Sequence, residues 1–386
     1  MAADAAEARQ QRFAASSKIP GMSLFSKRYQ PVTPDFIDKL PETGKILVID
    51  IAGLGDLVHA LPALWSIRQA RPRAQLHCIA NANWSSLLRI APWIDRVWDY
   101  QERPKSIQAS DFALARLIRR ERFDACINLM GSNRSCIIGR LSGARYRLGR
   151  KPFEEHRPGW RRFNTHVMEY PYRSELRYQQ KWKCLQQAGI GCAAPHFEID
   201  AQAVALPADL ADAVGTPYLH VSACASASQK ELSPQQMAEL LVGLRTALPQ
   251  HRLVLSSSCH PRETEALQAL LALLPFQPWR TYPGTLDAAQ LFRVIGGAAL
   301  HLGPDTGSLH LAWLGGTPAV CWSAGILREW VPPEARVHSL VSAEPPVDYL
   351  RGIDTAAILA AAGDLIGTKA SEVQQPPQSR GGAVAA

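Results

Sequence analysis

Short, continuous apolar runs alternate with helical segments along most of this chain, and that alternation restricts the fold more than any other feature. The first unit is the β-branched run at 45–51, which leads through a glycine-containing turn into apolar residues at helical spacing over 57–67. Strands that are buried on both faces read as continuous apolar runs, and parallel strands need helical crossovers between them. The pattern therefore predicts an α/β fold with doubly wound parallel sheets.

The alternation occurs in two separate series. In the first series we expect helices at 84–90 and 111–121, and strands at 45–51, 75–80, 96–99 and 125–130. In the second we expect strands at 218–221, 252–255, 299–302 and 319–322. The second series also holds a helix start, because Ser233 is a capping residue, Pro234 fits the first helical position, and Gln236 completes a capping box.

A loose stretch rich in alanine, glycine and proline, residues 189–217, separates the two series. We therefore predict two Rossmann-like domains, 45–188 and 218–370, joined by this linker. The total of 386 residues agrees with two domains, and an apolar content of 47% with 20% charged residues is typical of globular proteins. We expect residues 1–44 to form a flexible extension and 371–386 a disordered tail.

The eight cysteines show no C-x-x-C pair and no zinc-like spacing, so we predict buried reduced thiols and no metal site. The N-terminal residues lack the apolar core of a signal peptide, and the most apolar stretches are too short for the ~18–20 residues that span a bilayer. These features predict a cytoplasmic protein, with membrane contact limited to peripheral association at the inner face.

The first expected strand leads into the turn AGLGDLVH at positions 52–59. Its two glycines suggest part of a dinucleotide-binding fingerprint, but the third glycine of G-x-G-x-x-G falls at Val58, where a side chain blocks the pyrophosphate. The glycines instead let the backbone approach a ligand, and Asp56 stands at the start of a helix. Asp56 is then either an ordinary capping carboxylate or a functional acid, while His59 is more typical of a packed histidine than of a catalyst.

Two segments of the second series suit an anionic ligand. The sequence GPDTGSLHLA at 303–312 follows an expected strand, and free N–H groups at Thr306 and Gly307 together with a helix N-terminus would bind a diphosphate. A well-capped structural helix is the alternative interpretation. The sequence SACASASQK at 222–230 offers small hydroxyl residues and the point charge of Lys230, although a solvated loop fits it equally well.

Together these segments resemble the ADP-heptose:lipopolysaccharide heptosyltransferases, a family of glycosyltransferases. The family's Leu-Gly-Asp turn, with a following His and Leu-Pro-Ala-Leu, is matched by LGDLVHALPAL at 54–64. Its Asp-Thr-Gly-x-x-His-Leu-Ala and Gly-x-Pro are matched by DTGSLHLA at 305–312 and GTP at 316–318. Both motifs occur in the family's order, and the resemblance spans roughly residues 45–353.

The resemblance implies the GT-B architecture, in which two facing Rossmann-like domains hold the acceptor (45–188) and the nucleotide sugar (218–370). It implies inverting transfer of heptose from ADP-heptose to the lipopolysaccharide inner core, with Asp56 as the general base, which must lie ~2.6–3.2 Å from the attacking hydroxyl. Lys230 and the Thr306-Gly307 backbone would stabilise the departing ADP without a metal or other cofactor. The implied substrate-binding residues are Gly55, Ser226, Lys230, Glu263, Asp305, Thr306, Gly307 and His310.

The chain departs from the family's pattern in three places. It has DIAG at 50–53 where the family commonly has a basic residue and serines, Leu232 where the family often has Trp, and WSAG at 322–325 in place of Phe-Gly-Pro-Thr. Two alternatives therefore stay open: a glycosyltransferase of the same fold that uses another nucleotide sugar or acceptor, and a nucleotide-sugar-binding protein without transfer activity.

The positive charge is concentrated in one segment. The whole chain carries +8, and residues 134–183 alone hold thirteen basic and four acidic residues, a net +9. Because this segment belongs to the first domain, we expect its arginines to bind the phosphates and carboxylates of an anionic lipid A–Kdo type acceptor and to favour the inner-membrane surface. A solvated basic face is the alternative. No recognised RNA-binding module is present, so we expect no nucleic-acid partner.

Overall fold

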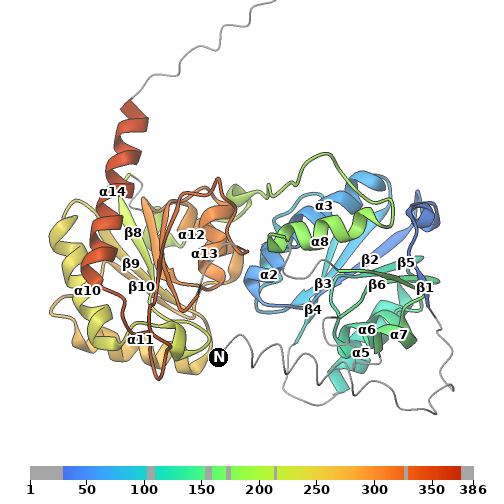
Figure 1. The fold of residues 1–386 in the computed structure, drawn as a ribbon, viewed down its shortest axis with the longest axis horizontal. Helices are drawn as coiled ribbons and strands as arrows, with labels where there is room; N and C mark the ends of the chain where they lie inside the picture. Colours follow the sequence, from blue (N-terminus) through green and yellow to red (C-terminus); the bar gives the residue numbers. More distant parts are fainter. Residues whose placement is uncertain are drawn as a thin grey trace, which may run out of the picture.

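The computed structural model describes residues 29–101, 109–152, 159–170, 175–212, 215–325 and 329–374. Within these residues the chain forms two parallel sheets, each lying between layers of helices, in two domains side by side (Figure 1). The predicted α/β class with two doubly wound parallel sheets is confirmed.

The first sheet has the strand order β1-β7-β6-β5-β2-β3-β4. Its strands are β1 (Gln30–Pro31), β2 (Lys45–Asp50), β3 (Gln75–Asn81), β4 (Arg96–Tyr100), β5 (Ala125–Asn128), β6 (Tyr146–Arg150) and β7 (His166–Met168). One face is covered by α2 (Leu54–Val58), α3 (Leu61–Ala70) and α8 (Arg177–Gln186), the other by α5 (Ala109–Arg120), α6 (Asn133–Leu141) and α7 (Gly159–Phe163). A short α4 (Ser86–Arg89) follows β3.

Alternate residues of β2 enter two different apolar cores. Ile46 and Val48 pack in the core beneath α2 and α3, whereas Leu47 and Ile49 pack in the core beneath α5 and α6. Because both faces of the strand are buried, both sets of positions are apolar. This is the physical reason for the continuous apolar run in the sequence.

The structure differs from the expectation that residues 1–44 are a flexible extension. Residues 1–28 lie outside the described residues, but β1 pairs with β7 and a 3-10 helix η1 (Pro34–Lys39) buries Phe36 completely. These short elements are held by tertiary contacts, which local periodicity does not signal. At the other end, α14 (Thr355–Gln374) extends into the expected tail, and residues 375–386 lie outside the described residues.

The second sheet has the strand order β10-β9-β8-β11-β12-β13. Its strands are β8 (Tyr218–Ser222), β9 (Arg252–Ser257), β10 (Arg280–Pro283), β11 (Leu300–Pro304), β12 (Ala319–Ser323) and β13 (Val337–Val341). One face packs on α10 (Pro234–Ala247), α11 (Pro261–Leu273) and α14, the other on α12 (Ala288–Gly296) and α13 (Gly307–Leu314). The predicted capping box of Ser233 and Gln236 is present at the start of α10.

The two domains meet at the carboxyl edges of their sheets. Helix α2, which follows β2, lies against α13, which follows β11 (Figure 1). The connecting segment 189–217 contains η2 (Ala201–Ala203) and α9 (Ala208–Ala211), and its Phe197 packs edge-on against Trp313 of α13 at 5.2 Å. In open parallel sheets this edge is where ligands bind, so the domain junction is the region to inspect.

No helix in the described part of the chain is long and apolar enough to cross a membrane. All eight cysteines are free, and six of them are buried. Burial raises the pKa of the Cys136 thiol to about 11 and that of Cys224 to about 12, which keeps both thiols protonated. Cys259 departs from the expected burial, because it lies exposed in the turn after β9.

Candidate active site

The turn after β2 and the turn after β11 are in direct contact. A Cβ atom on Gly55 would lie 2.4 Å from Cδ2 and 2.8 Å from Nε2 of His310. A Cβ atom on Gly307 would likewise lie 2.7 Å from Cβ of Leu54. Only glycine permits so close an approach at either position. The two sequence motifs, far apart in the chain, therefore pack directly against each other.

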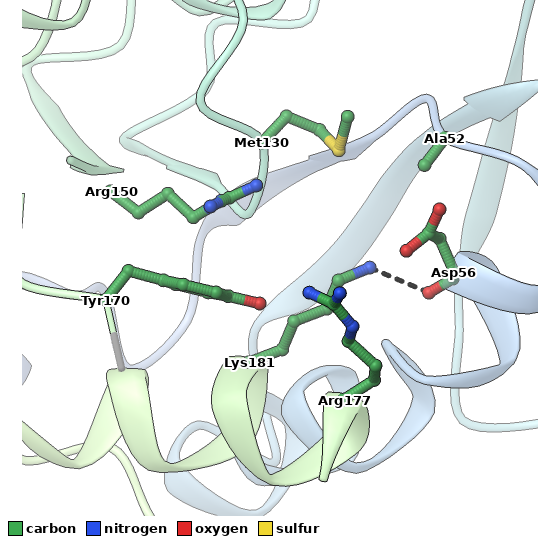
Figure 2. A pocket seen from close by; sticks show the side chains of 7 residues that line it. All are labelled: Ala52, Asp56, Met130, Arg150, Tyr170, Arg177 and Lys181. Atoms are coloured by element: carbon green, nitrogen blue, oxygen red, sulfur yellow. Dashed lines mark hydrogen bonds between the residues drawn. The ribbon is translucent and has the colours of Figure 1, made fainter. Parts of the chain in front are cut away.

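Asp56 lies in the first turn of α2 and faces a pocket of about 140 Å³ (Figure 2). The pocket belongs to the first domain, and three cationic side chains share it with this single carboxylate. Its lining residues are Ala52, Asp56, Met130, Arg150, Tyr170, Arg177 and Lys181. Guanidinium and ammonium groups in a concave site favour an anionic ligand, although Lys181 pairs with Asp50 and Arg177 with Glu329 outside this lining.

Lys181 makes two short polar contacts at the pocket. Its Nζ donates to Oδ2 of Asp50 at 2.6 Å and to the backbone carbonyl oxygen of Asp56 at 2.7 Å. The two side chains of this ion pair are only 5% and 3% exposed. Burial raises the pKa of Asp50, and the neighbouring Lys181 charge and hydrogen bond act against that rise.

The other two cations come from different elements, Arg150 from β6 and Arg177 from α8. The Arg150 guanidinium stacks 4.1 Å from the ring centre of Tyr170, and its Nε donates to the Leu129 carbonyl at 2.7 Å. Arg177 reaches the second domain, where it lies 4.3 Å from the ring centre of Trp330 and forms a 3.4 Å ion pair with Glu329. The pocket therefore borders the domain junction.

His310 is a neutral donor at this junction. Its Nδ1 accepts a hydrogen bond from Nε1 of Trp313 at 3.1 Å, so the proton is assigned to Nε2, the ring nitrogen on the side of Gly55. Burial lowers the pKa of His310 to about 4, although the charges of Asp305 and Asp56 act in the opposite direction. His310 thus supplies an N–H group at neutral pH and no positive charge.

His59 stands beside His310 but is completely buried, with ring centres 4.8 Å apart. Burial holds its pKa well below the ordinary histidine value. The structure thus favours the interpretation of His59 as a packed histidine.

The start of α13 lies beside a cation. Lys230, at the end of η3 (Ser228–Lys230), has its Nζ 3.1 Å from the Asp305 carbonyl oxygen and 3.7 Å from the Asp305 carboxylate. Thr306 occupies the N-cap position but makes no capping hydrogen bond, and its hydroxyl contacts Ser308 Oγ at 2.9 Å instead. The first N–H groups of α13 therefore receive no side-chain cap, as is also the case in α2, α3 and α8.

The comparisons with known proteins agree with one another. Residues 112–322, more than half of the chain, match the model for glycosyltransferase family 9 (heptosyltransferase). The chain belongs to glycosyltransferase family 9. The enzyme is therefore a glycosyltransferase, and the predicted family resemblance is confirmed.

Individual relatives of this family 9 enzyme are distant. The lipopolysaccharide core heptosyltransferase OpsX of Haemophilus influenzae is 23% identical over 279 residues, which cover 71% of this chain and 77% of OpsX. A family 9 structure from Veillonella parvula superimposes with a TM-score of 0.69 at 18% identity, covering 86% of this chain and 99% of that one. The structure of E. coli heptosyltransferase WaaC with ADP-2-deoxy-2-fluoro heptose superimposes with a TM-score of 0.64 at 18% identity. The match covers 83% of this chain and 99% of WaaC. These similarities confirm the GT-B fold.

The remaining predicted residues of the family 9 enzyme lie along the carboxyl edge of the second sheet. Ser226 is exposed in the loop after β8, and that loop is fixed by Glu231, whose Oε1 accepts from the Ala225 N–H at 2.6 Å and pairs with Arg262 at 2.7 Å. Glu263 is buried after β9, where its Oε2 accepts from the Ser258 N–H at 3.2 Å. The loop is thus braced by an ion pair, while Ser226 itself is exposed to solvent.

Sequence reasoning missed the individual pocket residues. It counted Arg150, Arg177 and Lys181 among the thirteen basic residues of one segment without assigning them to a site. One signal in the sequence pointed to a basic partner. Asp50 is a charged residue in an otherwise apolar strand, and a buried charge needs a partner of opposite sign. In the part of the chain that the structure describes, no group of three or more His, Cys, Asp or Glu side chains is arranged to hold a metal ion.

Proposed function

We propose that this enzyme transfers heptose from ADP-heptose to the lipopolysaccharide inner core, with inversion at the anomeric carbon and Asp56 as the general base. The observation that supports this most strongly is the contact between Gly55 and His310, because it joins the Asp56 turn of one domain to the helix start of the other. The nucleotide sugar bound to E. coli WaaC and the lipopolysaccharide core named for OpsX suggest the two substrates.

In this proposal the Asp56 carboxylate accepts the proton of the acceptor hydroxyl while the hydroxyl oxygen attacks C1 of heptose. The bond from C1 to the β-phosphate oxygen breaks, and ADP leaves with the bonding electrons. Lys230 and the uncapped N–H groups at the start of α13 stabilise the negative charge that grows on the β-phosphate. The neutral His310 offers a further hydrogen bond at the same junction.

The pocket in front of Asp56 suits the proposed acceptor. A lipid A–Kdo type molecule carries carboxylates and phosphates, and Arg150 and Arg177 present planar guanidinium groups that bind such oxygens in pairs. Another anionic acceptor could pair with the same arginines, and another nucleotide sugar could bind at Lys230 and the start of α13. A protein that binds nucleotide sugars without transfer is the other alternative.

A ligand screen followed by a transfer assay tests the proposal. Thermal unfolding is measured with ADP-heptose and with UDP- and GDP-sugars, and we expect selective stabilisation by ADP-heptose, about 2.7 kcal/mol at 100 times its dissociation constant. Incubation with Kdo–lipid A should then add one heptose to the acceptor. Binding without transfer would favour the binding-protein alternative, and indifference to every nucleotide sugar would contradict the proposal.

Lys230→Ala should weaken ADP binding. A charge-assisted contact contributes about 1.5–3 kcal/mol, so the dissociation constant should rise roughly 10- to 100-fold by titration calorimetry. Gln229→Ala is the matched control, because Gln229 is exposed in the same short helix. An unchanged ADP affinity of Lys230→Ala would remove Lys230 from the nucleotide site.

We further propose that the protein is cytoplasmic and that α5 contacts the anionic inner face of the membrane. Phe112 and Leu117 on this helix are 63% and 47% exposed, and Arg116 and Arg120 are exposed beside them. These four residues lie on the side of the helix opposite the buried Ala115 and Ile118. Exposed apolar side chains flanked by arginines are typical of helices that lie in a membrane interface.

Vesicle binding tests this contact. We expect the protein to sediment with vesicles that contain phosphatidylglycerol, and Arg116→Glu/Arg120→Glu to abolish most of that binding, since each basic residue near an anionic surface contributes about 1 kcal/mol. Arg245→Glu/Arg252→Glu makes the same charge change at exposed positions of the second domain and should bind normally. Equal loss in both variants, or no binding by the wild type, would contradict the docking of α5.

A further inference from the structure

Lys181 joins the three elements that surround Asp56. It projects from α8, and its ammonium group contacts the Asp50 side chain at the end of β2. The same group contacts the backbone of Asp56 in α2 (Figure 2). The residues lie 131 and 125 positions apart in the chain. Both charged side chains are almost completely buried, which fixes the ammonium group in place.

The Asp56 carbonyl needs this donor because the helix breaks after it. In a continuous α-helix the N–H of Ala60 would donate to the Asp56 carbonyl, four residues earlier. Here the Ala60 N–H donates to the Leu57 carbonyl at 3.0 Å, where α2 ends and α3 begins, and Pro62 has no N–H to offer. The Lys181 ammonium therefore takes the place of a helical N–H at the residue whose side chain faces the pocket.

Asp50 in turn holds Lys181. Its Oδ2 accepts from the ammonium at 2.6 Å, and its Oδ1 lies 3.4 Å from the Ala52 N–H. A lysine side chain has several rotatable bonds, and a buried carboxylate partner restricts its ammonium to one place. The strand end, the ammonium and the Asp56 carbonyl thus form one rigid chain of contacts.

We propose that the Asp50–Lys181 pair is a positioning device that fixes the backbone of Asp56 and so aims its carboxylate at the acceptor hydroxyl. The inference rests on the proposed role of Asp56 as the general base. Neither Asp50 nor Lys181 transfers a proton in this account. Small displacements of a reacting group reduce rates strongly, so loosening this backbone should slow the chemical step and leave donor binding intact.

Steady-state kinetics with ADP-heptose and Kdo–lipid A test the inference. Lys181→Met should lower kcat at least tenfold, while the KM for ADP-heptose stays within about twofold of the wild type. Lys181→Arg, which keeps a cation with several donors, should retain most of kcat. Lys183→Met is the matched control, since Lys183 lies on the same helix and pairs with Glu175 at 2.9 Å, and it should behave as the wild type.

Two further measurements separate positioning from a loss of folded protein. Lys181→Met leaves Asp50 as an unpaired buried charge, so Asp50→Asn/Lys181→Met, which removes that charge, should fold with wild-type ADP binding and still show the low kcat. In an Asp56→Asn background, Lys181→Met should cause no further loss, because the group that it positions is already absent.

The outcomes distinguish the inference from the function on which it rests. An unchanged kcat in Lys181→Met, or an equal loss in the presence and absence of Asp56, would overturn the positioning role while wild-type transfer stands. No transfer by the wild type would overturn the proposed function itself, and with it the role of Asp56 that the pair is inferred to serve.

Discussion

An Asp56→Asn enzyme is expected to bind ADP with wild-type affinity and to transfer sugar at least about 100-fold more slowly. Asparagine keeps the size of the side chain but cannot accept the proton of the acceptor hydroxyl, and general-base catalysis contributes roughly 10²- to 10⁴-fold. The side chain faces the pocket, whereas Gly55 and Leu54 of the same helix approach α13. Transfer rates and ADP calorimetry on one preparation measure both quantities.

The control for Asp56→Asn is Glu169→Gln, which neutralises an exposed carboxylate of the same domain that lies 3.6 Å from Lys151. It should transfer sugar as the wild type does. Normal turnover by Asp56→Asn would remove Asp56 from catalysis. A parallel fall in transfer and in ADP affinity would instead assign Asp56 to the stability of the domain junction.

The parts of the fold that local physics determines could be read from the sequence. Strand β2 was expected because both of its faces are buried, which makes Ile46, Leu47, Val48 and Ile49 apolar without interruption. The start of α10 was expected because the hydrogen bonds of its capping box lie within four residues. The strand β1 and the helix η1 were missed. A strand of two residues and a helix with one buried residue, Phe36, produce no repeating pattern of apolar residues in the sequence.

The residues of the candidate site likewise include some that local sequence motifs place and some that only the tertiary fold brings together. Asp56 and Thr306 follow strands directly, so their motifs give both their position and their surroundings. The pocket cations come from β6 and α8, and the chain brings them to Asp56 only through the tertiary fold. Their segment could be predicted from its net charge, but the choice of Lys181 over its twelve basic neighbours depends on which side chain reaches the carboxylate of Asp50.

The departure from the family's pattern at positions 50–53 has a structural reason. Asp50 carries a negative charge at the end of β2 and binds Lys181, and Ala52 lines the pocket. Asp50 and Lys181 thus neutralise each other beneath the surface of the pocket. The guanidinium groups of Arg150 and Arg177 also line the pocket, and Arg177 pairs with Glu329 of the second domain.

The junction between the domains should be the most sensitive point of the molecule, and Gly55→Ala tests it. Alanine favours helix over glycine by roughly 0.5–1 kcal/mol, so α2 taken alone would gain stability. The added Cβ would lie 2.4 Å from Cδ2 of His310, however, and that ring is held by Trp313 at 3.1 Å and by His59, whose ring centre lies 4.8 Å away. The ring cannot turn aside, so α2 and α13 must separate.

We expect Gly55→Ala to reduce transfer about 100-fold, because the separation moves Asp56 away from the nucleotide side, and to destabilise the protein by about 1–3 kcal/mol. Gly53→Ala is the matched control, two residues earlier in the same turn. Its φ is −67° and its Cβ would meet nothing within 4 Å, so its transfer rate and melting temperature should stay close to the wild type. If both variants behave alike, helix propensity or turn flexibility explains the glycines. A loss confined to Gly55→Ala instead means that catalysis requires the contact of this turn with His310.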